Sequence, residues 1–319
     1  MVKKLFVVLA LILVALGGAA HAQVAAPTRI VIAFPPGGPV DFVARVLADG
    51  LSKELGTTVL VDNKPGGNGA ISAQAVINAK PDGNTLWFTS AGAAAINPGL
   101  YEKLTYKMSD MAPVSLVVNN VEVLVTQPNN PARTTADLVA QSKQRKDPTA
   151  IASSGIGSMP HLAMELLASS TGANLLHVPY KGAAPAITDV MGGQVTAFFG
   201  DIPGLIGHVK NGKLKPLGIA APKRSTALPD VPTLDEQGIH GVESNNWYAL
   251  FVPAQTPTAR IDQLNAAVRK VLTSEPFRTR LLESGTEPAP GSPAELATLV
   301  RNDTAKWSKL IKEKNIKDE

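Results

Sequence analysis

The sequence contains no cysteine, which excludes disulfide bonds, thiol catalysis and thiolate ligands for a metal. One apolar run lies near the N-terminus. No second run of about 18 apolar residues follows it, so we expect no membrane insertion of the mature chain. The surplus of 30 basic over 26 acidic residues is too small to indicate a nucleic-acid partner. With 45% hydrophobic residues, the chain can fold on its core alone.

Catalytic motifs are also missing. The chain has no Gly-x-Ser-x-Gly elbow, no Gly-x-x-x-x-Gly-Lys-Ser/Thr loop and no His-Glu-x-x-His. The run Gly67-Asn68-Gly69 lacks the third spaced glycine of a dinucleotide fingerprint. His161 and Glu165 stand one helical turn apart without a third candidate ligand, which favours a structural pair over a metal site. We therefore expect no enzyme, no cofactor and no metal.

The first 22 residues have the pattern of a secretory signal. Lys3 and Lys4 precede the apolar run 5–16, and Ala20-His21-Ala22 fits the rule for cleavage after Ala22. Export of a chain without disulfides favours a bacterial periplasm. Removal of the signal leaves 319 − 22 = 297 residues, enough for two domains of about 150 residues.

The stretch after the signal predicts a strand, a tight turn and a helix. Residues 29–33 are apolar, Pro35-Pro36-Gly37-Gly38 breaks the strand, and the helix that follows ends at Gly56. Its apolar stripe recurs every four residues, at Val43, Leu47, Leu51 and Leu55. A helix N-terminus at the end of a strand presents free N–H groups and favours an anion.

Within this turn, Gly38 is the expected N-cap, which places Pro39 in the first helical position and leaves the amides of Val40 and Asp41 free. The carboxylate of Asp41 can either brace the loop through backbone N–H groups or compete with an anionic ligand. We expect it to brace the loop.

The rest of the chain alternates strands and helices. Three strand, loop and helix units predict a parallel sheet with helices on both faces, with a small-residue loop at 90–95. The pair Asn119-Asn120 separates two apolar runs and suggests the passage to a second lobe. A strand at 150–152, a Gly/Ser loop and a helix containing Pro160 repeat the opening design. The tail predicts one strand and three helices that return to the first lobe, at 247–253, 259–274, 276–284 and 293–314.

Two such turns in facing lobes would enclose a small anion between two helix N-termini. The alternative is that both are ordinary connections between strands and helices. The expected domains are the signal (1–22), lobe 1 in two pieces (23–122 and 232–319) and lobe 2 (123–231).

Several motifs, in this order, resemble the Bug family of periplasmic solute receptors of tripartite tricarboxylate transporters, from about Arg29 to the C-terminus. They are Phe34-Pro35-Pro36-Gly37-Gly38-x-x-Asp41-x-x-Ala44-Arg45, Asn63-Lys64-Pro65-Gly66, Pro81-Asp82-Gly83, Asn97-Pro98-x-Leu100-Tyr101, Ser154-Gly155-x-Gly157-Ser158-x-x-His161-Leu162, Val178-Pro179-Tyr180-Lys181-Gly182, Pro185-Ala186-x-x-Asp189-Val190-x-Gly192-Gly193-Gln194-Val195 and Leu228-Pro229-Asp230-Val231-Pro232-Thr233.

The resemblance implies an α/β fold of the two-lobe periplasmic binding protein type (type II, Venus-flytrap), with a ligand cleft between the lobes. It implies that backbone amides, hydroxyls and ordered water bind a carboxylate. The implied ligand-binding residues are Phe34, Pro36, Gly37, Gly38, Val40, Asp41, Ser90, Ala91, Gly92, Ser154, Gly155, Gly157, Ser158, Gly200 and Asp201.

The expected function is capture of a small organic carboxylate, either an aliphatic dicarboxylate, an amino acid or an aromatic acid, by a monomer. Its partners would be the membrane permease subunits of a tripartite transporter. A ligand sensor that docks on a signalling kinase is the alternative, and an enzyme is the least favoured. Pro39-Val40 departs from the family pattern, in which a small or hydroxyl residue commonly follows the glycine pair. We interpret it as a bulkier apolar edge suited to an aromatic or branched acid.

Overall fold

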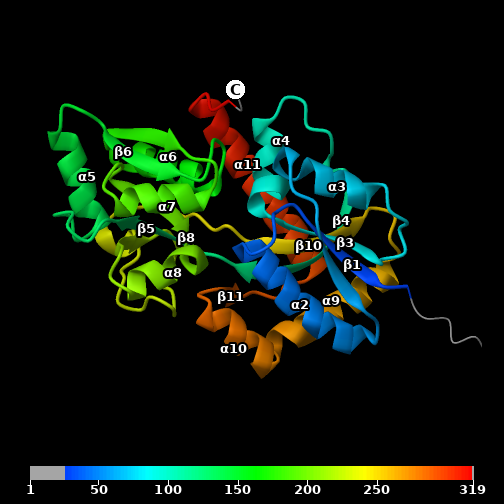
Figure 1. The fold of residues 1–319 in the computed structure, drawn as a ribbon. Helices are drawn as coiled ribbons and strands as arrows, with labels where there is room; N and C mark the ends of the chain where they lie inside the picture. Colours follow the sequence, from blue (N-terminus) through cyan, green and yellow to red (C-terminus); the bar gives the residue numbers. More distant parts are fainter. Residues whose placement is uncertain (1–25, 318–319) are drawn as a thin grey trace, which may run out of the picture.

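The computed structural model describes residues 26–317, so the expected signal and its cleavage after Ala22 lie outside the described residues. Figure 1 shows two lobes side by side, each with a central sheet and helices on both faces. In the described part, no helix combines the length and the apolar character needed to cross a membrane.

Lobe 1 is our name for the six-stranded sheet and its helices. The sheet has the order β11-β4-β10-β3-β1-β2. β1 pairs in parallel with β2 and β3, whereas β10 is antiparallel to β3 and β4, so the sheet is mixed rather than parallel as predicted. Strand β10, from the C-terminal part of the chain, inserts between β3 and β4. A sequence pattern of repeated strand and helix units gives no sign of such an insertion. The strands are β1 (Thr28–Ile32), β2 (Val59–Asn63), β3 (Thr85–Ser90), β4 (Met111–Asn119), β10 (Tyr248–Pro253) and β11 (Glu287–Pro288).

The two faces of this sheet are covered by different helices, because side chains alternate along each strand. Ile30 and Ile32 pack with α2, α9 and α10, whereas Val31 packs with α3, η2, α4 and α11. The helical segments are α2 (Pro39–Leu55), η1 (Gly67–Gly69), α3 (Ala70–Ile77), η2 (Gly92–Ile96), α4 (Asn97–Leu100), η3 (Met108–Asp110), α9 (Thr258–Thr273), α10 (Glu275–Glu283) and α11 (Pro293–Glu313). The tail therefore returns to the first sheet, as the sequence predicted.

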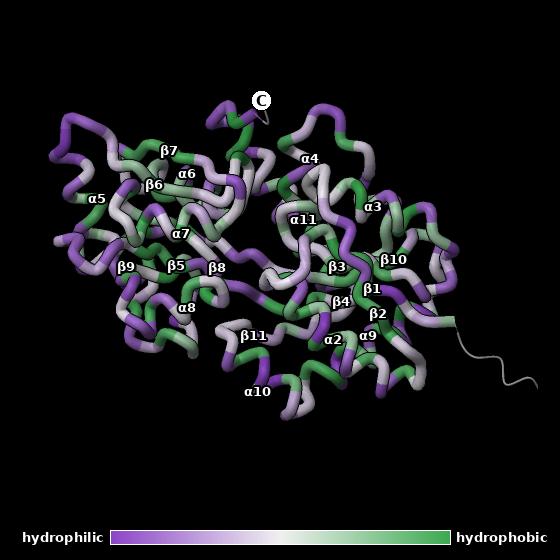
Figure 2. The backbone as a smooth tube through the Cα atoms, viewed as in Figure 1, coloured by the Kyte–Doolittle hydropathy of each residue, from purple (hydrophilic) through white to green (hydrophobic). Residues whose placement is uncertain are grey.

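Lobe 2 is our name for the five-stranded sheet and its helices. This sheet has the order β7-β6-β8-β5-β9, with α7 and α8 on one face and α5 and α6 on the other. Its strands are β5 (Glu122–Thr126), β6 (Thr149–Ser153), β7 (Leu175–Pro179), β8 (Ala197–Asp201) and β9 (Lys215–Ile219). Its helices are α5 (Thr135–Gln144), α6 (Met159–Thr171), α7 (Ala183–Met191) and α8 (Ile202–Lys210), and η4 (Asp235–Gln237) follows β9. Figure 2 shows hydrophobic residues along the strands of both lobes and hydrophilic ones on the outer loops.

Two chain segments cross between the lobes and pair with each other. β4 ends at Asn119 in one sheet and β5 begins at Glu122 in the other. On the return crossing, Asn245 forms an antiparallel bridge with Val121, and the N–H of Asn246 donates to the carbonyl of Asn120 at 3.0 Å. The chain therefore leaves lobe 1 after Asn119 and returns to it at Asn245 and Asn246, while Leu234, Ile239 and Val242 still pack in the core of lobe 2.

Two of the helical segments that the sequence did not predict are informative. Residues 90–95 were expected to form a loop, yet the chain turns helical at Ala91 and continues as the π-helix η2. Its alanines are buried against α11, and that packing supplies the stability that a run of small residues does not signal. The other is α8, whose Gly204 and Gly207 lower its helix propensity, although its apolar face is buried on the sheet.

Helix α2 approaches α9 at Gly50, which yields a stability prediction. A Cβ at this position would lie 2.4 Å from Cγ1 of Val271. We expect Gly50→Ala to lower the free energy of unfolding by about 1 to 3 kcal/mol in urea titrations, because overpacking exceeds the helix-propensity gain. Gly207→Ala in α8 is the matched control, since a Cβ there meets nothing within 4 Å. The control should be neutral or stabilising, and equal effects of both substitutions would contradict the packing argument.

Candidate ligand-binding site

The first turn has the predicted geometry. Gly38 is the N-cap of α2, Pro39 follows at the first helical position, and Gly37 has φ +89°. Asp41 is buried, and its Oδ2 accepts a hydrogen bond from the N–H of Gly37 at 3.0 Å. The expectation that Asp41 braces the loop is therefore confirmed.

Two further side chains complete this brace. Arg45 forms a two-pronged contact with Asp41, from Nε to Oδ2 at 2.9 Å and from Nη2 to Oδ1 at 2.8 Å. The Nδ2 of Asn63 donates to Oδ1 of Asp41 at 2.9 Å and to the carbonyl of Phe34 at 3.0 Å. The hydrogen bond from Arg45 is the main reason why the pKa of Asp41 falls to about 2. The charge of Arg45 is thus engaged, and the exposed donors of the turn are backbone amides.

The amides of Gly38, Val40 and Asp41 make no hydrogen bond within residues 26–317, as expected for the first turn of a helix. The side chain of Val40, however, is only 5% exposed and belongs to the core between α2 and the sheet. The side chain of Val40 therefore does not form an apolar edge, whereas Pro39 is exposed and the interpretation of that residue stays a prediction. The amide of Val40 faces the turn while its side chain faces the core.

The second predicted segment, residues 90–92, follows β3, the strand next to β1. Because the two strands are parallel, Ser90 and the first turn lie at the same edge of the sheet. The hydroxyl of Ser90 makes no hydrogen bond within the described residues. Ala91 is fully buried, its N–H donates to the carbonyl of Trp247 at 2.9 Å, and Gly92 begins the π-helix.

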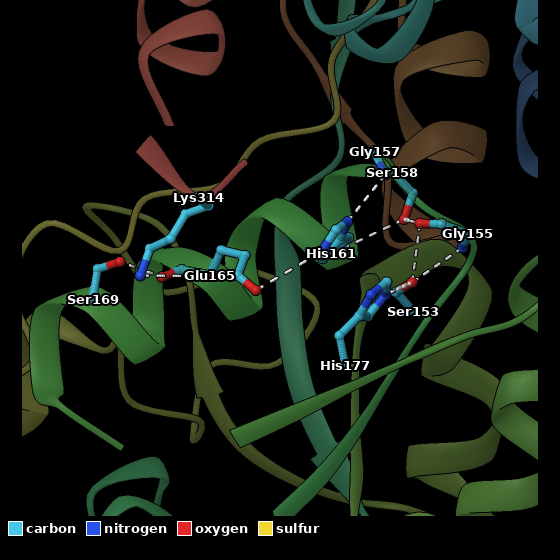
Figure 3. Close-up of polar contacts among 9 residues, drawn as sticks. All are labelled: Ser153, Gly155, Gly157, Ser158, His161, Glu165, Ser169, His177 and Lys314. Atoms are coloured by element: carbon cyan, nitrogen blue, oxygen red, sulfur yellow. Dashed lines mark hydrogen bonds and ion pairs between the residues drawn. The ribbon is translucent and has the colours of Figure 1, made fainter. Parts of the chain in front are cut away.

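The second turn, between β6 and α6, is held by its own hydrogen bonds (Figure 3). The Ser158 hydroxyl donates to the carbonyl of Gly155 at 2.7 Å and caps α6, and the Ser158 N–H also points to that carbonyl, at 3.2 Å. The N–H of Gly155 donates to Oγ of Ser153 at 3.1 Å. The Ile156 and Met159 amides and the Ser154 hydroxyl make no hydrogen bond within the described residues, so they can bind a ligand.

Two stacked histidines lie behind this turn (Figure 3). The His161 and His177 rings are parallel within 4° and 3.6 Å apart between centroids. The Nδ1 of His161 accepts from the N–H of Gly157 at 3.1 Å, and Nε2 of His177 hydrogen-bonds Oγ of Ser153 at 2.6 Å. Burial lowers the pKa of His177 to about 4, and burial together with His177 lowers the pKa of His161 to about 3. Both rings are therefore neutral near pH 7.

His161 also lies near Glu165, with Nε2 and Oε1 3.8 Å apart, and Lys314 contacts the other oxygen of Glu165 at 3.8 Å. Among residues 26–317, no three His, Asp or Glu side chains gather as ligands for a metal ion. The pair is part of the support beneath the second turn.

The fourth predicted segment, Gly200 and Asp201, ends β8. The Oδ2 of Asp201 accepts from Nδ2 of Asn246 on the returning crossing at 2.8 Å and from the hydroxyl of Tyr248, the first residue of β10 in lobe 1, at 3.4 Å. Glu122 is the cross-strand neighbour of Asp201 and accepts a hydrogen bond from Ser244. Burial raises the pKa of Asp201 to about 7, and burial next to Asp201 raises the pKa of Glu122 well above its usual value.

Two of the four segments approach the other lobe. Gly157 approaches the α4 helix of lobe 1 so closely that a Cβ on it would lie 2.1 Å from Cδ2 of Leu100. Asp201 reaches Asn246 and Tyr248 as described above. A separate cavity of about 420 Å³ lies beside the crossings, and its lining includes none of the predicted site residues.

Apart from Asp41, sequence reasoning did not assign the side chains that support the turns and the crossing. Arg45 stands four residues after Asp41, a spacing at which opposite charges meet on a helix, and it was available as a signal. No sequence pattern joins His177 or Asn246 to the site, because each contact crosses between strands or between lobes.

Comparisons with known proteins show the family and the fold. The model of the Tripartite tricarboxylate transporter family receptor matches residues 43–316. Protein BugT of Bordetella pertussis is 34% identical over 295 residues, which cover 92% of this chain and 90% of BugT. Rpa4515 of Rhodopseudomonas palustris, solved with adipate, is 31% identical with a TM-score of 0.83, and the match covers 92% of this chain and 99% of that one. MatC (Rpa3494) of the same organism, solved with malate, is 30% identical with a TM-score of 0.78, covering 90% and 99%.

The brace of the first turn can be tested by Asp41→Asn. A carboxyl with a lowered pKa in the folded state adds stability above pH 4 that is lost as the pH falls through about 2. We expect the variant to lose about 1 to 2 kcal/mol of unfolding free energy at pH 7, allowing for solvent around Arg45, and to converge with the wild type near pH 2. Asp49→Asn, on the same helix and exposed opposite Arg280, should change stability by less than about 0.5 kcal/mol. A pH-independent difference at position 41 would refute the ionic brace.

The buried carboxyls at the crossings predict the opposite pH dependence. A carboxyl with a raised pKa in the folded state contributes stability at low pH, and this contribution is lost as the pH rises from about 4 through about 7. Asp201→Asn should therefore stabilise the protein at pH 8 by about 1 to 4 kcal/mol, measured by urea unfolding from pH 4 to pH 8. Glu122→Gln should act in the same direction. A wild-type-like pH profile for both variants would show that neither carboxyl is held neutral.

Proposed function

The chain belongs to the family of tripartite tricarboxylate transporter receptors, and on this basis we propose that it captures a small organic carboxylate between its lobes. We propose further that it delivers this acid to membrane permease subunits. The observation that carries this proposal is the pair of braced turns, each presenting unpaired amides at a helix N-terminus. A partial positive charge at each N-terminus suits a carboxylate without any lysine or arginine in contact with it.

The proposed ligand contacts are the predicted segments at 34–41, 90–92, 154–158 and 200–201. Within the second segment the hydroxyl of Ser90 is the strongest donor, and within the third we add the amides of Ile156 and Met159. The malate and adipate in the related structures are aliphatic dicarboxylates, so that class is the first to test, followed by amino acids and aromatic acids.

The function carries no chemical step. The groups with shifted pKa values at the site are hydrogen-bonded or buried. His177 contacts the Ser153 hydroxyl, but no carboxylate contacts His177 within the described residues, so this pair lacks the third member of a catalytic triad. Periplasmic location follows from the family, and we propose cleavage after Ala22 as the route to it.

A ligand should raise the melting temperature of the purified mature chain. At a concentration of 100 Kd, a bound acid adds roughly 2.7 kcal/mol to the free energy of unfolding. We expect a shift with at least one of malate, adipate, an amino acid or an aromatic acid, and no shift with the neutral amide of the same acid. If a folded preparation showed no shift with any acid, carboxylate capture would be wrong. Loss of uptake after gene deletion separates transport from sensing, because a sensor would leave uptake intact.

A further inference from the structure

The first turn in lobe 1 and the second turn in lobe 2 are each held by the same kind of hydrogen bond. In both, the side chain at the third helical position accepts the N–H of the glycine just before the N-cap. Asp41 accepts from Gly37 at 3.0 Å, and His161 accepts from Gly157 at 3.1 Å. Both glycines have positive φ, +89° and +69°, a conformation that favours glycine. The match is one of position and role, since one acceptor is a carboxylate and the other an imidazole.

The two braces differ in charge. Asp41 carries a negative charge that Arg45 neutralises through two hydrogen bonds. At the second turn the acceptor is the neutral His161, and the titratable groups that face it are His177 and Glu165. No arginine contacts this position within the described residues, and Lys314 is engaged with Glu165. A carboxylate at position 161 would therefore put an unneutralised charge behind the amides of Ile156 and Met159.

We propose that His161 is a positioning residue of the second turn, and that its neutrality is what allows this turn to accept the ligand's carboxylate. This inference rests on the proposed function. A neutral acceptor fixes the direction of the glycine amide as a carboxylate does, yet it adds no repulsion to an incoming anion. His177 supports it by stacking on the ring and by tying Ser153 to the same turn.

The proposal separates geometry from charge, and three substitutions test both. The side-chain oxygen of His161→Asn or His161→Asp can take the place of Nδ1 as acceptor, whereas His161→Leu offers no acceptor. All three remove the stack on His177, so the comparison between asparagine and aspartate isolates the charge. Ser169→Asp, which adds the same charge two helical turns further along the exposed side of α6, is the matched control.

We would measure Kd by calorimetry at pH 7, with malate or adipate as the probe, according to which one shifts the wild-type melting temperature. We expect His161→Asn to bind within about threefold of the wild type, and His161→Asp about 10- to 30-fold more weakly, with the gap narrowing as salt is added. Ser169→Asp should change Kd by less than about twofold. Hydrogen exchange at the amide of Gly157 should be slow in the wild type and in the asparagine variant, and fast in His161→Leu.

Equal affinities for the asparagine and aspartate variants would overturn the role of neutrality. Slow exchange at Gly157 in His161→Leu, with unchanged affinity, would overturn the positioning role. If the aspartate variant does not fold by circular dichroism, the asparagine and leucine pair still decides the positioning role. A wild type that binds none of the acids defeats the proposed function instead, and the exchange at Gly157 still reports on the brace.

Discussion

The structure of the candidate site depends on one hydrogen bond made twice, from the N–H of a glycine to the side chain three positions into the following helix. Each glycine lies between the strand and the helix and has positive φ, which turns the chain sharply. Its own N–H then needs an acceptor outside the helix backbone. If that N–H stayed unpaired in a partly buried turn, it would cost roughly 1 to 3 kcal/mol. The acceptors Asp41 and His161 remove this cost and leave the later amides unpaired at the helix N-terminus.

Burial and hydrogen bonding of the groups behind the two turns also leave little net formal charge around them. Asp41 is ionised but paired with Arg45, and the two histidines behind the second turn are neutral because they are buried. At the crossings, burial disfavours the ionised forms of Asp201 and Glu122. Each of these titratable groups is therefore either paired with an opposite charge or shifted toward its uncharged form. The partial charges of the two helix N-termini are left to dominate the local field.

Much of this arrangement could be predicted from the sequence, for a physical reason. The N-cap at Gly38, the bracing role of Asp41 and the helix end at Gly56 follow from local rules that act within a few residues. The mixed sheet and the helix at η2 could not be predicted in this way, because they arise from packing between distant segments. Val40 shows the limit most clearly. The sequence places it beside the glycines, but only the fold shows that its side chain turns into the core of lobe 1.

Selectivity among acids then has to come from shape rather than from charge. Backbone amides at two fixed helix ends bind any carboxylate of suitable size in a similar way, so they distinguish acids weakly. In the proposed site the side chain of Val40 lies in the core, so the exposed Pro39, the edge at Ser90 to Gly92 and the second turn around Ile156 are among the groups left to shape the space around a ligand. The edge leads into the π-helix η2, and the second turn packs against Leu100 of the adjoining α4. Because α4 follows η2 directly, the packing of Leu100 connects this edge of the proposed site with the second turn.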